Sequence, residues 1–312
     1  MKDLCPITLN LRFCIEESIT FQNYSGFSVR GMFYEILKHE DPDLANSIHS
    51  GGALAPFSLS PLIFTKGNSS KIAWKEVNSP SIGMITISLL DDNLIKIFES
   101  LILKGDLKEI TLSNKKFPIT EIGVQEINFN KILESSQPVQ SFRIKFRTPT
   151  YFRRSLYNCC SHCPLYQSIL KAKMAKINVN ICPYYKLERQ YRFILFPDPI
   201  LLFRSLLRIW RKYSKIEIDY KGFMNWIEKG GVALAGYPKG LKTLKVVEHP
   251  LTKKWLVGFI GTVYFNLPLE TYDQNYAKIC DALLRFGEIV NVGGGRTAGL
   301  GLIQYQPIEH ID

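Results

Sequence analysis

Gly287-Glu-Ile-Val-Asn-Val-Gly-Gly-Gly-Arg-Thr-Ala-Gly-Leu-Gly301 is the most distinctive stretch of this chain of 312 residues. So many glycines in so few residues require either an unusual backbone path or the close approach of another chain. A dinucleotide-binding fingerprint needs a strand before its glycines and a helix after them, and here the predicted order is the reverse. The Gly-Lys-Ser/Thr ending of a phosphate loop is also missing. The sequence therefore disfavours nucleotide binding of either kind.

Two interpretations of this stretch remain open at the level of sequence. In the first, it is a structural turn between a helix and the last strand. In the second, exposed backbone amides at Gly293, Gly294 and Gly295 receive phosphate groups together with the side chain of Arg296.

In the rest of the chain, hydrophobic periodicity predicts the order β-α-β-β-α-β twice. In the first half, alternation predicts a strand at 7–15, and helical spacing predicts helices at 29–37, 43–49 and 94–102, with apolar segments at 57–64 and 82–90 and a strand within 107–129. After a linker at 134–138, the second half predicts strands at 142–146, 231–247, 256–265 and 300–305 and helices at 198–213 and 272–286.

This element order predicts an α+β protein with two tandem ferredoxin-like (βαββαβ, RRM-like) domains. We expect residues 1–135 to form the amino-terminal domain with the active-site helix. Residues 139–312 would form the second domain, with the Gly-rich loop and a Cys-containing insertion at about 153–190. The prediction depends on element order alone, since the two halves show no sequence repeat.

Composition favours a globular, cytoplasmic protein with an anionic partner. Hydrophobic residues make up 46% of the chain and its formal net charge is +11, which favours an anion over a small neutral substrate. The first residues lack the apolar core of a signal peptide, and no apolar stretch approaches the roughly 20 residues that span a bilayer. The sequence therefore predicts no association with a membrane.

Cationic side chains recur on one face of three predicted elements. They are Arg143, Lys145 and Arg147 on a strand; Arg204, Arg208, Arg211 and Lys212 on a helix; and Lys239 and Lys242 in the loop Tyr237-Pro-Lys-Gly-Leu-Lys242. Like charges at i and i+4 cost stability unless an anion joins them. We interpret the strand and the helix together as one groove for an RNA backbone. The alternative is a set of merely solvated faces.

Several segments resemble a known family. The helix ending in Leu-Arg-Phe-Gly-Glu288, with the Gly-rich loop and short strand after it, resembles the CRISPR repeat endoribonucleases, the Cas-six family of the RAMP superfamily. Residues 142–152 resemble the start of that family's second ferredoxin-like domain. Asp41-Pro-Asp-Leu-Ala-Asn-Ser-Ile-His49 and Ala55-Pro-Phe-Ser-Leu-Ser60 resemble its active-site region.

The resemblance implies an endoribonuclease that cleaves precursor CRISPR RNA within its repeats without a metal or other cofactor. The ribose 2′-hydroxyl attacks the adjacent phosphate, which leaves 2′,3′-cyclic phosphate and 5′-hydroxyl ends. Its partners would be CRISPR repeat RNA and other Cas proteins of an interference complex. The alternative is a non-catalytic RAMP-type scaffold that only holds CRISPR RNA.

The resemblance also implies two catalytic residues. His49 matches the family's catalytic histidine by its Leu-Ala-x-x-x-His context, and imidazole exchanges protons near neutral pH. A surface histidine at a helix end is the other interpretation. Tyr34 matches the active-site tyrosine, and the sequence places it off the apolar stripe of its helix.

Arg30 and Lys38 share the face of Tyr34 at i−4 and i+4, and we predict that they contact phosphate. The lysine that several family members carry after the histidine is missing, because residues 51–56 contain none. Lys66 and Lys71 are the candidates to replace it.

Two further readings stay open. Cys159, Cys160, Cys163 and Cys182, with His162, are enough in principle for tetrahedral zinc. Reduced buried thiols are favoured over such a site, because the spacing is irregular. A metal-dependent nuclease would need converging carboxylates, and Asp91-Asp92 and Asp41 with Asp43 are better explained as helix starts.

Overall fold

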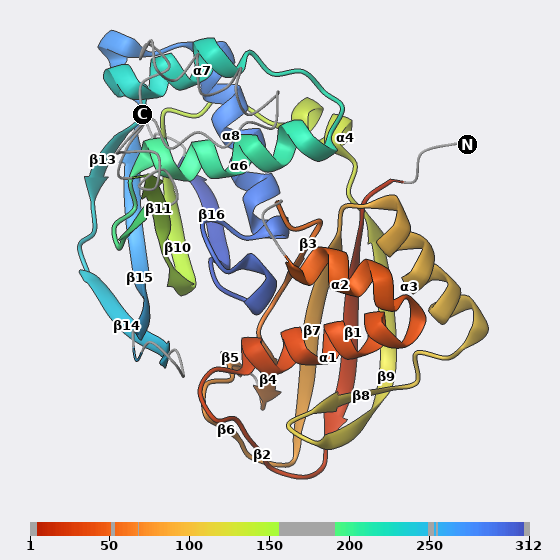
Figure 1. Ribbon diagram of the computed structural model, residues 1–312. Coiled ribbons are helices and arrows are strands. Elements are labelled where there is room, and N and C mark those ends of the chain that lie inside the picture. Colours follow the sequence, from red (N-terminus) through yellow and green to blue (C-terminus); the bar gives the residue numbers. More distant parts are fainter. Residues whose placement is uncertain are drawn as a thin grey trace, which may run out of the picture.

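The computed structural model describes residues 5–50, 54–67, 69–155, 191–248, 253 and 255–308. Within these residues the chain forms two units that lie side by side, each built on an antiparallel sheet with helices packed on one face (Figure 1). The amino-terminal unit is red to yellow in the figure and the carboxyl-terminal unit is green to blue. None of the described helices has the length and apolar character needed to cross a bilayer.

The first unit has the strand order of a ferredoxin-like fold. Its principal strands lie in the order β4-β7-β1-β9, so that the first strand in the chain is central. All of these pairs are antiparallel. The elements are β1 (Ile7–Ile15), β2 (Ile19–Thr20), α1 (Ser25–Glu40), α2 (Pro42–Ser50), β3 (Phe57–Leu59), β4 (Ile63–Lys66), β5 (Ser69–Ile72), β6 (Glu76–Val77), β7 (Ser81–Leu89), α3 (Asp92–Lys104), β8 (Glu109–Leu112) and β9 (Lys115–Glu126).

The second unit repeats this order as β13-β15-β10-β16. The long strand β15 pairs with β13 along one half and with β14 along the other. The elements from the linker onward are α4 (Phe129–Ser135), β10 (Ser141–Thr150), β11 (Phe152–Ser155), β12 (Tyr191–Ile194), α6 (Pro199–Tyr213), α7 (Tyr220–Trp226), the π-helix η2 (Ile227–Gly231), β13 (Ala233–Gly236), β14 (Leu241–Glu248), β15 (Trp255–Asn266), η3 (Leu269–Thr271), α8 (Gln274–Val290), η4 (Arg296–Ala298) and β16 (Ile303–Ile308).

Local sequence explains where these elements form. Every second residue of β1, from Ile7 to Ile15, is buried, as a strand with one covered face requires. The helix α6 begins where the side chain of Asp198 accepts a hydrogen bond from the N–H of Leu201, with Pro199 as the first helical residue. The structure confirms both predictions, and with them the two tandem ferredoxin-like domains.

Each unit has its own core, and a third apolar cluster joins the two units. Its buried members are Tyr24 of the first unit and Tyr151, Val246 and Leu300 of the second. Hydrogen bonds reinforce the seam: the Asn291 amide donates to the carbonyl of Leu59 (2.9 Å) and the Tyr24 hydroxyl to that of Gly299 (2.8 Å). The two units therefore share a packed boundary.

A buried carboxylate fixes the linker between the units. Asp281 of α8 is fully buried, and it accepts hydrogen bonds from the N–H of Gln137, from Arg285 and from the hydroxyl of Tyr305. One side chain therefore connects the linker, a helix and the last strand of the second unit.

Three parts of the structure differ from the sequence prediction. The helix α8 continues to Val290, so the Gly-rich loop begins at Asn291 rather than Gly287. The helix α4 includes the first two residues of the predicted linker. The hairpin β11–β12 and the helix α7 were not predicted: β11 lies at the start of the predicted insertion, and the sequence prediction assigned no element to 191–194 or 220–226. Most of the predicted Cys-containing insertion lies outside the described residues.

Candidate functional site

The Gly-rich loop, residues 291–302, fills the seam between the two units. A Cβ atom at Gly294 would stand 2.2 Å from the ring of Tyr151, and one at Gly299, where φ is +69°, would stand 2.6 Å from the backbone nitrogen of Pro61. The glycines are needed because both units approach the loop backbone closely. The structure thus supports the structural interpretation of this loop at these two positions.

The backbone amides of the loop are partly occupied. The N–H of Gly294 donates to the carbonyl of Tyr151 (2.9 Å), and that of Gly293 points at the Ser205 hydroxyl (3.5 Å). For Gly295, no acceptor of its N–H lies among the described residues. Gly295 therefore remains a candidate phosphate donor, whereas Gly293 and Gly294 already have protein partners.

Arg296 is placed differently from its prediction. Its side chain is buried, and it donates to the carbonyls of Val290 (2.9 Å) and, across the seam, of Ala55 (3.1 Å). Burial lowers the pKa of Arg296 to about 10, and the charge of Arg208 acts in the same direction. The guanidinium stays protonated at neutral pH and joins the two units. The reason is that the loop folds inward at Arg296, which sequence spacing does not reveal.

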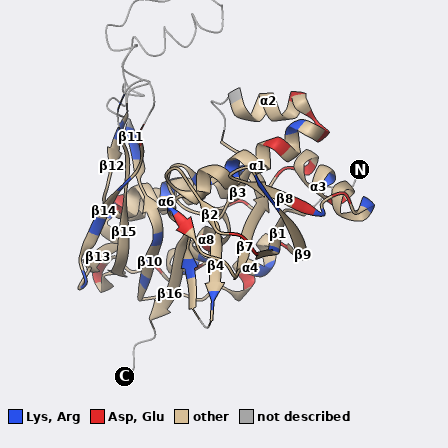
Figure 2. Ribbon diagram, turned by 90° about the horizontal axis from the view of Figure 1, so that it is seen from below, with Lys and Arg blue, Asp and Glu red and all other residues tan. Residues whose placement is uncertain are grey.

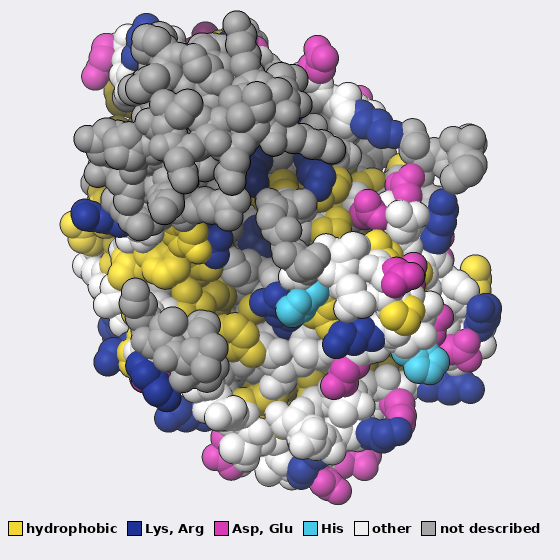
Figure 3. Space-filling view, viewed as in Figure 1, with side chains coloured by type: hydrophobic (Ala, Val, Ile, Leu, Met, Phe, Trp, Pro, Cys, Tyr) yellow, Lys and Arg dark blue, Asp and Glu magenta, His cyan; other side chains and the backbone are white. Residues whose placement is uncertain are grey.

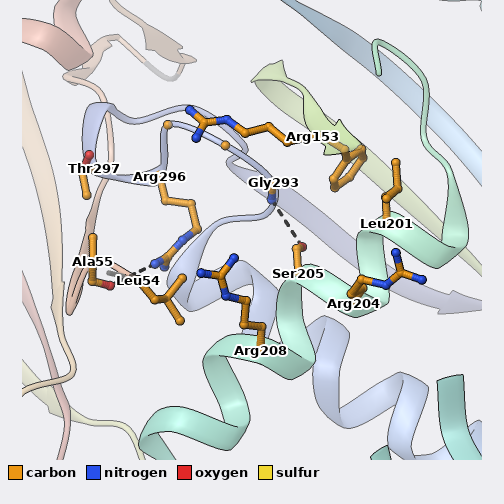
Figure 4. Close-up of a pocket in the computed structure, with 13 residues that line it drawn as sticks. Leu54, Ala55, Arg153, Leu201, Arg204, Ser205, Arg208, Gly293, Arg296 and Thr297 are labelled. Atoms are coloured by element: carbon orange, nitrogen blue, oxygen red, sulfur yellow. Dashed lines mark hydrogen bonds between the residues drawn. The ribbon is translucent and has the colours of Figure 1, made fainter. Parts of the chain in front are cut away.

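A pocket of about 430 Å³ lies where the loop meets α6, the hairpin β11–β12 and the first unit. Figure 4 shows Arg153, Arg204 and Arg208 around it, from β11 and α6, with Leu54 and Ala55 on the opposite wall. We call it the seam pocket; it is lined by Leu54, Ala55, Phe152, Arg153, Leu201, Arg204, Ser205, Arg208, Gly293, Gly294, Gly295, Arg296 and Thr297. With four arginines and no carboxylate in this lining, the seam pocket suits an anion.

A second pocket, of about 520 Å³, continues the seam pocket along α6. It shares Leu54, Arg204 and Arg208 with the first and adds Arg211, Lys212 and Tyr220. We call the two together the α6 groove. It brings together all the cations predicted on this helix.

The cations of the α6 groove differ in their partners. Arg204 forms an ion pair with Glu228 (2.9 Å), Arg211 lies over the ring of Tyr220, and Lys212 donates to the carbonyl of Leu54. Among the described residues, Arg208 has no hydrogen-bond or ion-pair partner. Arg208 is therefore the cation of the groove that is most available to a phosphate.

His49 and Tyr34 come together, as predicted for a catalytic pair. Their rings lie edge to face with centroids 5.3 Å apart, and the Arg30 guanidinium lies 5.5 Å from the Tyr34 centroid. His49 is exposed at the end of α2. Figure 3 shows a histidine beside Lys or Arg side chains near the middle of the face that carries α1 and α2. We call His49, Tyr34 and Arg30 the histidine cluster.

The histidine cluster lies close to the α6 groove along the chain. Leu54, which lines both pockets, follows His49 by five residues, and five residues span at most about 18 Å. The backbone of His49 therefore lies at most about 18 Å from that of Leu54, which lines both pockets.

Tyr34 is more buried than predicted. Only 8% of its surface is exposed, and its ring packs against Phe33 and Phe57 as well as His49. The periodicity of α1 alone places Tyr34 outside the apolar stripe, but α2 and β3 fold over that side of the helix. Lys38 is exposed one turn further along α1. Lys66 and Lys71 lie on the β4–β5 hairpin and line neither pocket.

The cationic strand lies on the other side of the second sheet from α6. Phe142, Ile144 and Phe146 of β10 face the core that α6 and α8 cover, so the alternating Arg143, Lys145 and Arg147 face away from both helices. Figure 2 shows Lys and Arg, in blue, along β10 and β14 of this sheet. The single groove predicted from sequence is therefore wrong: strand and helix present two separate cationic surfaces.

The loop predicted to read a base belongs to the strand's surface. Tyr237, with Pro238 and Tyr264, lines a pocket of about 450 Å³ at the edge of the sheet. Tyr264 pairs with Arg143 in the β10–β15 register, and Lys242 lies opposite Ile260 on the same side. We call this surface the open sheet face; its members are Arg143, Lys145, Arg147, Tyr237, Lys239, Lys242, Thr262, Tyr264, Gln304 and Gln306.

Other predicted residues have simpler places. Asp91 accepts a hydrogen bond from Asn93 at the start of α3, and Asp41 accepts one from Leu44 at the start of α2, as predicted for helix-start residues. Cys159, Cys160, Cys163, Cys182 and His162 lie outside the described residues. Sequence reasoning missed Arg153, because we assigned it to the insertion; its place just after a cationic strand was the available signal.

Comparison with known proteins agrees with this architecture. The chain spans 97% of its length against 99% of a Thermus thermophilus Cas6 in a product complex, with 18% identity and a TM-score of 0.68. A Cas6 in a substrate mimic complex matches with 16% identity over 96% of this chain and 99% of that one, with a TM-score of 0.59. A Cas6-related protein from Pyrococcus furiosus matches with 12% identity over 96% and 98%, with a TM-score of 0.53.

No curated protein sequence matches the chain. Two family models do: that of the Cas6 N-terminal domain matches residues 5–140, and that of the CRISPR-associated endoribonuclease Cas6 matches residues 144–303. Together they cover most of the chain, which therefore belongs to the Cas6 family of CRISPR-associated endoribonucleases.

Proposed function

We propose that this protein cleaves precursor CRISPR RNA within its repeats by attack of a ribose 2′-hydroxyl on the adjacent phosphorus. The bond from phosphorus to the 5′-oxygen breaks, which leaves a 2′,3′-cyclic phosphate and a 5′-hydroxyl. The observation that carries the proposal is an exposed imidazole that contacts the Tyr34 ring, over which a guanidinium also lies, five residues before Leu54 of the anion-binding groove. Solved structures of similar fold include a Cas6 product complex and a substrate mimic complex.

In this mechanism His49 exchanges a proton with the reacting oxygens, either as the base at the 2′-hydroxyl or as the acid at the departing 5′-oxygen. Arg30 stabilises charge that develops on the phosphate. The Tyr34 ring holds the imidazole in place. No metal takes part, and no cofactor is required.

The RNA backbone enters the α6 groove, where Arg208, Arg204 and Arg153 neutralise phosphates next to the scissile one. The open sheet face binds a more distant segment of the same RNA through Arg143, Lys145 and Arg147. The sheet separates the two surfaces, so a single short segment does not reach both.

The experiment compares His49→Ala with the unchanged protein on repeat RNA in the presence of a chelator. We expect the variant to bind RNA normally and to cleave about 10²- to 10⁴-fold more slowly, the usual contribution of a proton-transfer group. The matched control is His39→Ala, which removes an exposed histidine of α1 that takes no part in the cluster. Analysis of the product ends tests for the cyclic phosphate.

A scaffold that only holds CRISPR RNA would bind the repeat but show no cleavage for either protein. Cleavage that is lost with chelator, or that survives His49→Ala unchanged, would contradict the mechanism.

A further inference from the structure

The hairpin β11–β12 carries an exposed aromatic surface next to the seam pocket. In its register Arg153 lies opposite Phe193, and Tyr191 lies two residues before Phe193, so all three side chains share one face. Tyr191 is 47% exposed and Phe193 is 41% exposed, which is unusual for such large rings. Figure 3 shows hydrophobic side chains gathered beside Lys and Arg over the strands of the second unit.

The two rings rest on a firm base. The Phe193 ring meets the ring of the buried Tyr151 at 4.7 Å with an interplanar angle of 64°, and it lies 5.7 Å from the ring of Tyr191. Tyr151 in turn packs against the backbone of Gly294, where a Cβ atom would overlap it. The surface is therefore anchored to the Gly-rich loop.

Arg153 connects this aromatic surface with the seam pocket. Its guanidinium lies 4.6 Å from the centroid of the Tyr191 ring and 5.7 Å from that of Tyr151, and the same side chain lines the pocket. Figure 4 shows it extended beside the Gly-rich loop. A phosphate that Arg153 contacts therefore lies within one nucleotide of the exposed rings.

We propose that Tyr191 and Phe193 form a stacking site for one unpaired nucleobase, whose own or neighbouring phosphate is held by Arg153 in the seam pocket. The inference rests on the proposed function and names the substrate class of the same site. Bases inside an RNA stem are covered on both faces by their neighbours, and only an unpaired base, or one at the end of a stem, can stack on a protein ring. The preferred substrate is then a repeat with an unpaired nucleotide near its cleavage position.

The test is a double-mutant cycle between protein and RNA, measured as binding in the His49→Ala background so that the RNA stays intact. Single abasic positions are introduced along the repeat, and each RNA is bound to the protein with and without Tyr191→Ala plus Phe193→Ala. One abasic position should weaken binding about 5- to 100-fold, the usual range for a base stacked on an aromatic ring. The same position should have little further effect once both rings are gone.

Tyr191→Phe provides the matched control, because it keeps the ring and removes only the hydroxyl; it should bind like the parent. Neither residue belongs to a buried core cluster, and because Phe193 packs on Tyr151, the melting temperature of the double variant is measured to check that the fold is kept. Additive losses at every abasic position, or equal binding of a repeat with no unpaired nucleotide, would overturn the stacking site. The proposed function fails separately, if the chain with His49 present does not cleave any of these RNAs.

Discussion

The ring of Tyr34 contacts His49 edge to face, and this contact assigns Tyr34 a positioning role. Because only 8% of Tyr34 is exposed, the residue has little surface left for RNA, whereas the exposed imidazole beside it can reach a phosphate. The distinction between ring and hydroxyl can be measured directly.

Tyr34→Phe keeps the ring and removes the hydroxyl, and we expect it to cleave repeat RNA within about threefold of the unchanged protein. Tyr34→Leu removes the ring, so the imidazole of His49 loses the contact that positions it. The cleavage rate should fall at least tenfold at equal RNA affinity, because displacing a catalytic group by about 1 Å lowers the rate strongly. Single-turnover rates and RNA binding are measured for both variants. A large loss with Tyr34→Phe would instead give the hydroxyl a chemical role.

Arg296 is expected to act on stability rather than on RNA. Arg296→Ala removes two hydrogen bonds from a charged donor and leaves the carbonyls of Val290 and Ala55 without it. The free energy of unfolding should fall by about 3–6 kcal/mol, since the two bonds each contribute roughly 1.5–3 kcal/mol. Urea unfolding measures the change.

The control for Arg296 is Arg12→Ala, which breaks an exposed ion pair with Glu121 and should cost less than about 1 kcal/mol. If Arg296→Ala unfolds like the unchanged protein but binds RNA more weakly, the phosphate-binding interpretation of this residue is restored.

At the scale of elements, the sequence predicted those whose signals are local. Apolar and polar residues alternate strictly in β1, and α6 has Asp198 as its N-cap and Pro199 as its first residue. The positions of both elements could therefore be predicted from residues that are neighbours in the sequence. The end of α8 was placed too early because Gly287 is a poor helix former; the helix continues because Val290 is fully buried in the core. Packing between elements, which sequence periodicity does not contain, decides such cases.

The same limit applies to the candidate site. The His49 and Tyr34 pair followed from the family resemblance, and the α6 cations from their spacing. Tyr34 is buried because His49 of α2 and Phe57 of β3 pack against its ring. Arg153 lines the seam pocket because β11 lies next to the Gly-rich loop. Contacts between distant parts of the chain determine both.

The helix α6 offers a comparison between two arginines one turn apart. Arg208 has no ion-pair partner among the described residues, whereas Arg204 is already paired with Glu228. We expect Arg208→Gln to weaken RNA binding more than Arg204→Gln and to reduce the slope of log affinity against log salt by about 0.7–0.9, the value of one phosphate contact. Binding titrations at several salt concentrations measure both quantities, and equal effects of the two substitutions would contradict the ranking.

At the scale of the whole molecule, the predicted cations divide between two surfaces that a sheet separates. The α6 groove lies on the side of the helices and the seam, while Arg143, Lys145 and Arg147 lie on the open sheet face. Among the described residues of β10, β13, β15 and β16, every charged side chain is cationic. A surface whose charged strand residues are cationic in this way attracts a polyanion.

If one RNA occupies both surfaces, its length determines which substitutions matter. Lys145→Glu should weaken binding of a full-length repeat but leave unchanged the binding of a short RNA that contains only the cleavage position and its flanking nucleotides, because the short RNA occupies the α6 groove alone. Arg208→Gln should weaken both. Lys104→Glu, which makes the same change of charge on the exposed end of α3, controls for net charge. Equal losses for short and long RNA with Lys145→Glu would mean that the open sheet face acts only through the overall field of the protein, and the two-surface arrangement would then be abandoned.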